Sequence, residues 1–124
     1  MKYDQFVKQV EARGSFENRE HAEKAVRATL SVLGSRLAGG ETKDLASQLP
    51  PEVGAALPQT GGGETFGLDE FLRRVASEEG TGCGPDVVRQ HARAVLNTLS
   101  ESVTEGELED VRSQLPGDLR SLVG

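Results

Sequence analysis

The chain of 124 residues has little of what disulfides, strands or an aromatic core require. Its one cysteine, Cys83, cannot form a disulfide within the chain, so nothing in the sequence asks for an oxidising compartment. Isoleucine and tryptophan are absent, and there are only four phenylalanines and one tyrosine. We therefore expect a core made of leucine, valine and alanine, and the β-branched residues are too few and too scattered to predict strands.

Long apolar runs are also missing. No segment approaches the roughly 18 consecutive apolar residues of a transmembrane helix. Residues 1–4 include an acid and do not begin the apolar stretch of a signal peptide. We therefore expect a cytoplasmic protein with no membrane partner.

The net charge of −6 is concentrated in the second half of the chain. Residues 1–58 contain eight acidic and eight basic residues, whereas residues 65–124 contain eleven acidic and six basic ones. Glu64, which lies between them, supplies the remaining negative charge. A protein that binds the DNA backbone needs a basic face, so this composition argues against nucleic acid as a partner.

An internal repeat organises the sequence. The segment DQFVKQV at residues 4–10 matches DEFLRRV at residues 69–75 at an offset of 65. The segment SQLP at residues 47–50 recurs at residues 113–116 at an offset of 66. We interpret this pattern as a tandem duplication of one helical unit.

The duplication predicts a single domain over residues 1–124, with repeats at 3–58 and 68–124 and a flexible glycine-rich linker at 59–66. One repeat alone would bury too little apolar surface, so we expect the two copies to share a core with a pseudo-twofold relation. The alternative is that the linker lets units exchange between two chains.

Each copy predicts the same helices. Apolar residues spaced i, i+3, i+4 and i+7 predict a first helix from Tyr3 to Val10 and an equivalent one from Leu68 to Val75. The longest helices are expected near residues 18–38 and 85–103, each followed by a short helix and a last helical turn. The predicted fold class is all-α, a compact bundle with about three helices and a short turn in each copy.

The duplicated pattern resembles the uncharacterised bacterial family known as domain of unknown function 2267. The similar features are the openings at residues 4–7 and 69–72 and the segments QLPPEV and QLPGDL at residues 48–53 and 114–119. The resemblance covers nearly the whole chain and implies a small, cytoplasmic, helical protein. Its motifs are packing motifs, so no catalytic residue is carried over.

An acidic patch near the start of the last helices is the first candidate site. Its members are Glu101, Glu105, Glu107, Glu109 and Asp110. Acids at a helix N-terminus are favoured by the helix dipole, which explains most of the cluster without function. The functional interpretation is an anionic face for a basic partner.

A second set of charged residues repeats between the copies at the offset of 66. It consists of Arg27, Glu41 and Asp44 with their equivalents Arg93, Glu107 and Asp110. Such pairs could line a groove on the pseudo-twofold axis. The favoured interpretation is a salt bridge between the long helix and the third helix of each copy.

Cys83 and the two histidines are the remaining candidates. Cys83 precedes a helix start, which favours a reactive thiolate, but no base stands at a suitable spacing. His21 and His91 are not at equivalent repeat positions, and two histidines without a second cysteine make a poor zinc set. Asn18 and Val88, three residues before them, exclude the Glu-x-x-His motif of di-iron sites. We predict no metal and no cofactor.

No nucleotide-binding loop or nucleophile elbow is present. The leading hypothesis is therefore a non-enzymatic interaction module that binds a protein partner or forms a homodimer. One alternative is a small-molecule binding protein or enzyme with a pocket between the repeats, whose ligand the sequence does not identify. Another is a nucleic-acid binder, in which the second and third helices would resemble a helix-turn-helix, but the third helix is acidic.

Overall fold

The computed structural model describes residues 1–58 and 61–123. These residues form eight α-helices and no strand, which confirms the predicted all-α class. Gln59 and Thr60 of the expected linker, and Gly124 at the end of the expected domain, lie outside the described residues. The helices are α1 (Tyr3–Arg13), α2 (Arg19–Arg36), α3 (Glu41–Ser47), α4 (Pro51–Gly54), α5 (Leu68–Glu79), α6 (Pro85–Ser102), α7 (Glu105–Ser113) and α8 (Gly117–Arg120).

Local sequence signals set where several helices begin. At the start of α2 the Asn18 side chain accepts a hydrogen bond from the backbone N–H of His21 at 2.9 Å. At the start of α7 the Thr104 hydroxyl accepts one from the backbone N–H of Glu107 at 3.3 Å. Pro85 opens α6, at a position where its missing N–H would have had no helical partner. The long helices therefore begin within a residue of where the sequence predicts them.

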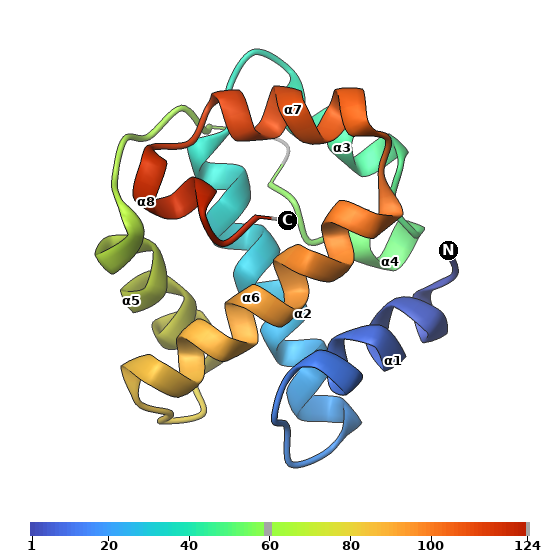
Figure 1. Ribbon diagram of the computed structural model, residues 1–124, viewed down its shortest axis with the longest axis vertical. Helices are drawn as coiled ribbons and strands as arrows, with labels where there is room; N and C mark the ends of the chain where they lie inside the picture. The colour runs from blue at the N-terminus through green and yellow to red at the C-terminus, as the bar shows by residue number, and fades with distance from the viewer. Residues whose placement is uncertain (59–60, 124) are drawn as a thin grey trace.

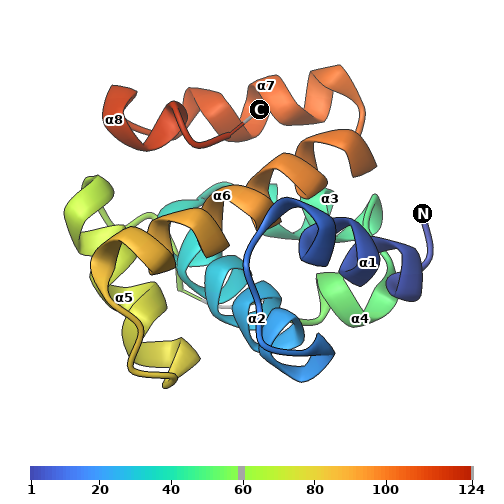
Figure 2. The ribbon, with the colours of Figure 1, turned by 60° about the horizontal axis from the view of Figure 1, so that its bottom comes forward.

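The two long helices, α2 and α6, cross at the centre of the molecule (Figure 1). Helices α1 and α5 flank them, and each contacts both long helices. The short helices α3 and α7 contact each other at one end of the molecule, and Figure 2 shows α7 and α8 as a layer over α6. The first four helices therefore pack against the last four, both at the centre of the molecule and where α3 meets α7.

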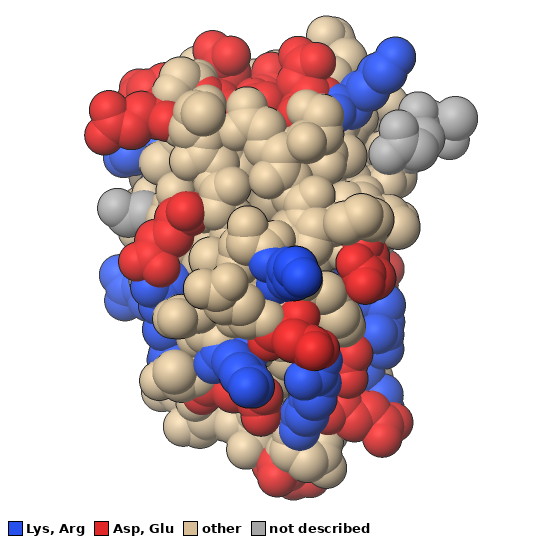
Figure 3. Space-filling model, turned by 90° about the vertical axis from the view of Figure 1, so that its right-hand side faces the viewer, with Lys and Arg blue, Asp and Glu red and all other residues tan. Residues whose placement is uncertain are grey.

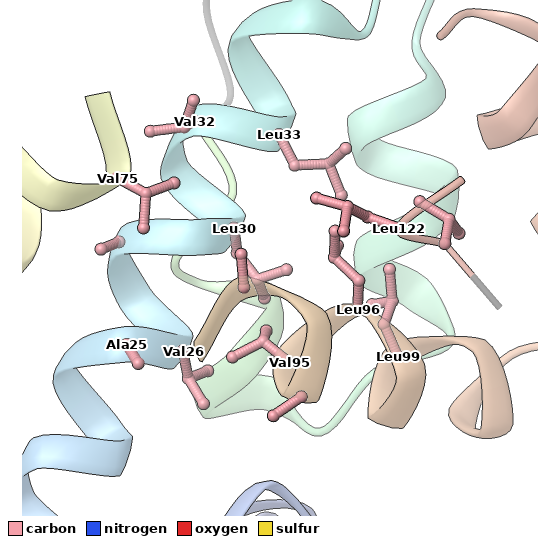
Figure 4. Packing of buried hydrophobic residues seen from close by; sticks show 14 of the residues in the cluster. Ala25, Val26, Leu30, Val32, Leu33, Val75, Val95, Leu96, Leu99 and Leu122 are labelled. Carbon is pink, nitrogen blue, oxygen red and sulfur yellow. The ribbon is translucent and has the colours of Figure 1, made fainter. Parts of the chain in front are cut away.

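Leucine, valine and alanine side chains fill the interior, with Phe6 and Phe71 as fully buried aromatic rings. In Figure 4, Leu30 of α2 lies against Val95 of α6, and Leu122 reaches the same cluster from the end of the chain. Burying a side chain of this size contributes roughly 1.5–3 kcal/mol, so these contacts hold the long helices together. No helix within residues 1–58 and 61–123 has both the length and the apolar character needed to cross a membrane.

The glycine-rich segment after residue 60 lies on the protein surface. The backbone N–H of Gly63 donates to the carbonyl of Leu37, and that of Glu64 donates to the carbonyl of Ser35, both at 3.0 Å. Gly62 has a φ of +97°, and a Cβ there would approach the Leu37 oxygen to 2.3 Å. Only glycine fits this position. The sequence predicts a flexible linker, but these described residues are held against the end of α2.

Candidate functional site

The acidic patch predicted from the sequence lies at the α7 end of the molecule. Figure 3 shows acidic side chains gathered along the top edge, at the height where α3 and α7 lie in Figure 1. Glu101 lies on α6 instead, and its carboxylate pairs with Arg13 at 2.5 Å. We define the acidic face as the acids of α3 and α7, namely Glu41, Asp44, Glu105, Glu107, Glu109 and Asp110.

Two buried carboxyl groups meet within the acidic face. Glu41 is 8% exposed and Glu107 is 6% exposed, and the Asp110 carboxylate lies within 4.8 Å of both. Burial, together with a hydrogen bond to Glu41 and the charges of Glu41, Asp44 and Asp110, raises the pKa of Glu107 to about 8. The Glu41–Glu107 pair therefore holds a proton at neutral pH, because two carboxylates in contact cannot both ionise without a large penalty.

The predicted salt bridges between the long helices and the third helices are not formed. Arg27 and Arg93 are exposed, and neither takes part in an ion pair within the part of the chain that the structure describes. The reason is the packing of α3 against α7, which turns Glu41 and Glu107 toward each other rather than toward α2 or α6. The equivalent acids are brought together, but without their arginines.

Most ion pairs of the described surface lie outside the acidic face, although exposed acids there, such as Glu17, Glu20 and Asp86, also make none. Among the described residues, the one ion pair on the acidic face joins Glu109 to Arg112 at 3.8 Å, an exposed contact that contributes little. The negative charge of the acidic face is therefore largely uncompensated. Pairs elsewhere include Asp4–Arg19 at 2.6 Å, Glu70–Arg74 at 2.8 Å and Glu64–Arg74 at 3.3 Å.

A second group of titratable side chains meets at the opposite end, where the sequence offers separate candidates and predicts no metal site. His21 of α2 and His91 of α6 have ring centroids 4.9 Å apart. Both contact the same carboxylate oxygen, Oε1 of Glu79 at the end of α5, at 3.3 Å and 2.9 Å. With the Cys83 sulfur, the four donor atoms lie within 4.8 Å of one another. We name these four residues the His–Glu–Cys cluster.

The His–Glu–Cys cluster is buried and tightly packed. His91 is fully buried, Glu79 is 3% exposed, and the His21 side chain is 10% exposed. The Nε2 atom of His91 lies 3.0 Å from the carbonyl oxygen of Ser15. The Phe16 ring stacks on His91 with centroids 4.5 Å apart, so the imidazole is fixed in orientation.

Solvent reaches this cluster through a surface hollow of about 330 Å³, whose lining includes His21, Thr81 and Cys83. The Thr81 hydroxyl lies 3.0 Å from Oε1 of Glu79 and 3.3 Å from the Cys83 sulfur. Cys83, for which the sequence indicates a candidate thiol without a suitably spaced base, is half-buried and stands beside imidazoles and a carboxylate. The loop before α6 thus brings the thiol to the cluster.

The repeat pattern could not reveal this cluster, because its members occupy non-equivalent positions in separate segments. His21 and Glu79, for example, are 58 residues apart. One signal was present in the sequence: His91 stands three residues after Val88 and four before Val95, on the apolar stripe of α6. A histidine on that stripe must be buried, and a buried imidazole needs polar partners.

The chain belongs to the DUF2267 family, described as an uncharacterized conserved protein, whose family model matches residues 3–122. This match confirms the resemblance carried by the repeated sequence motifs. No curated protein matches the chain. Membership identifies the family and assigns no activity and no site residue.

Proposed function

Because family membership assigns no activity, we propose from the geometry that the protein is a non-enzymatic interaction module whose acidic face binds a basic segment of a partner protein. The observation that supports this proposal is uncompensated charge. Helices α3 and α7 contain six acidic residues and two basic ones, Lys43 and Arg112. A surface of one sign attracts segments of the opposite sign and speeds their association.

The distribution of apolar side chains supports recognition by charge rather than by an apolar groove. Among the described residues, the large hydrophobic side chains that are exposed are Met1, at 44%, and Val87, at 38%. They belong to different segments and form no docking stripe. Two copies of the acidic face would repel each other, so this face favours a basic partner over a second copy of the chain.

The same proposal includes the duplication of one helical unit with a pseudo-twofold relation. The helices α1–α4 and α5–α8 follow the same order of lengths, with 18 residues in each long helix and four in each last helix. Together with the repeated sequence segments, this correspondence supports two tandem copies. The contact between Glu41 and Glu107 would then lie near the axis, so the two copies would build one acidic face between them.

Binding of a fluorescently labelled lysine-rich peptide tests the proposal. The variant Glu109→Lys with Asp110→Lys should weaken binding by about tenfold or more, which corresponds to roughly 1.4 kcal/mol. Raising the ionic strength should weaken binding by the wild type, because salt screens exposed charges. Duplex DNA labelled with the same dye should not bind.

The matched control is Glu17→Lys with Glu78→Lys, which alters net charge equally at two exposed positions outside the acidic face. This control should change peptide affinity less than about threefold, because the start of α2 and the end of α5 lie at the opposite end of the molecule from α3 and α7 (Figure 1), where salt screens their charges from the bound peptide. If both double variants weaken binding equally, net charge alone attracts the peptide, and the acidic face is not a binding site.

A further inference from the structure

The His–Glu–Cys cluster lies at the opposite end of the molecule from the acidic face, and the proposed binding of a basic partner does not involve it. We propose that this cluster binds one divalent transition-metal ion, and that zinc is the ion it fits. The proposal rests on the hydrogen positions that the geometry demands, on a buried oxygen without a partner, and on the chemistry of the four donor atoms.

The hydrogen positions around His91 leave a place for a cation. Its Nε2 atom lies 3.0 Å from the carbonyl oxygen of Ser15, which can only accept, so Nε2 carries a hydrogen. In a neutral imidazole Nδ1 then presents a lone pair, yet it lies 2.9 Å from Oε1 of Glu79. A lone pair facing a carboxylate oxygen needs a proton or a metal ion between or beside them. A metal bound at Nδ1 removes this conflict.

The Ser15 contact also has the form of an outer contact of a metal-bound histidine. Such ligands usually donate their other ring N–H to a carboxylate or a backbone carbonyl, which fixes the tautomer and the ring orientation. Here the ring is further held by the stacked Phe16 at 4.5 Å. These contacts orient the His91 ring so that its Nδ1 atom faces the cluster and could bind a metal ion without a change of rotamer.

Glu79 provides the second, independent observation. The residue is 3% exposed, and its Oε2 atom is buried with no hydrogen-bond partner. A buried carboxylate oxygen without a partner is costly, because the lost hydration is not replaced. The cluster contacts are made by Oε1, so coordination through both carboxylate oxygens would give Oε2 the partner that no described side chain provides.

The donor set identifies the class of ion. Two imidazole nitrogens, one carboxylate and one thiolate suit zinc and its neighbours, whereas calcium and magnesium require oxygen ligands. In a tetrahedral zinc site neighbouring ligand atoms are roughly 3.3–3.6 Å apart. The distance from Nε2 of His21 to Oε1 of Glu79 is already 3.3 Å, and all four donors lie within 4.8 Å. Small side-chain movements would complete the site.

The surface hollow of about 330 Å³ gives the ion a route to these donors. Two of them, His21 and Cys83, line the hollow, and Glu79 and His91 lie behind. The Thr81 hydroxyl, 3.0 Å from Oε1 of Glu79, is a positioning group for the carboxylate. The competing explanation is a metal-free contact between a protonated His91 and the Glu79 carboxylate, and this explanation predicts no metal affinity.

Calorimetric titration of the chelator-treated chain with zinc distinguishes the two explanations. We expect saturable one-to-one binding. Cobalt, used as a spectroscopic probe, should give the visible absorption of a tetrahedral site and the near-ultraviolet thiolate band of Cys83. The variants His21→Gln and Cys83→Ser should each weaken zinc binding at least about 100-fold, and Thr81→Val about 10–100-fold, as is usual for outer contacts.

The matched control is Glu20→Gln, an exposed residue that lines the same hollow without belonging to the cluster, and it should leave zinc affinity within about twofold. Circular dichroism of each variant establishes that it is folded. Three results would overturn the proposal: no saturable binding by the folded wild type, a cobalt spectrum without a thiolate band, or zinc binding that His21→Gln leaves intact and Glu107→Gln removes. The last result would place the ion at the acidic face.

Discussion

Each end of the molecule buries a glutamate, and the two glutamates have neighbours of different chemistry. Glu79 is 3% exposed and faces two imidazoles and a hydroxyl group. Glu107 is 6% exposed and faces another carboxyl group, Glu41. Both have lost most of their hydration, so what separates them is the kind of group that each one contacts. A second carboxyl group raises the pKa of Glu107, whereas the neighbours of Glu79 are imidazole and hydroxyl groups.

The two ends also differ in how they relate to the sequence repeat. Glu41 and Glu107 occupy equivalent positions at the offset of 66, whereas no two members of the His–Glu–Cys cluster do. The acidic pair therefore follows the repeated sequence pattern, which places the same residue type twice. The cluster combines residues that the pattern does not relate, so the pattern does not predict it.

The largest change in the free energy of unfolding is expected when the two buried glutamates are replaced one at a time. In metal-free protein at pH 7, Glu79→Ala should destabilise the fold by about 3–5 kcal/mol, because it leaves buried imidazole groups without their partner. Glu107→Ala should cost less than about 2 kcal/mol, because the lost packing is offset by relief of the carboxyl contact. Urea unfolding measures both. Equal losses would show that the neighbours of the two glutamates do not matter.

The next effect is a pH dependence at the acidic end. The folded-state pKa of Glu107 is raised to about 8 from its ordinary value of 4.5, so the folded protein retains a proton that the unfolded chain releases. The stability from this group is complete below about pH 4.5 and is lost as pH rises through 8. Glu107→Gln should flatten this slope and stabilise the protein at pH 8 by about 1–3 kcal/mol.

Urea unfolding across pH 5–9 checks this slope, with Glu105→Gln as the control. Glu105 is exposed on the same helix and makes no ion pair among the described residues. Its substitution should leave the slope unchanged. If both variants behave alike, the shared proton between Glu41 and Glu107 is absent.

A smaller effect compares the two helix caps, since each one binds the backbone N–H of a site residue. Asn18 caps His21 at 2.9 Å and Thr104 caps Glu107 at 3.3 Å. Asn18→Ala and Thr104→Ala should each cost about 1 kcal/mol, with the shorter bond giving the larger loss. Thermal unfolding measures both, and the serine variants, which retain an acceptor, should recover most of the stability. Thr104→Ala costing the more would contradict the ranking.

The smallest effect concerns the exposed charges. Glu109→Gln removes the 3.8 Å contact with Arg112, and it should change stability by less than about 0.5 kcal/mol. Urea unfolding at low and high salt measures this change. A loss above about 1 kcal/mol would mean that the acidic face stabilises the fold, which would weaken its assignment to partner binding.

The helices could be predicted from the sequence, because periodic apolar residues and capping side chains act locally. The stripe of Phe6, Val7 and Val10 and the cap at Asn18 suffice for α1 and the start of α2. The sites could not, because they depend on which helices meet. The repeat indicated that Glu41 and Glu107 belong together, but only the α3–α7 contact shows that they bind each other rather than an arginine.

The span of the His–Glu–Cys cluster has a kinetic consequence. His91 contacts Ser15 across 76 residues, and Glu79 contacts His21 across 58. Forming the cluster therefore closes long loops of the chain. The entropy lost in closing such loops must be offset before these contacts can form, which places them late in folding. Substitutions in the cluster should therefore accelerate unfolding while leaving the refolding rate nearly unchanged. The cluster would then contribute to the kinetic stability of the folded protein.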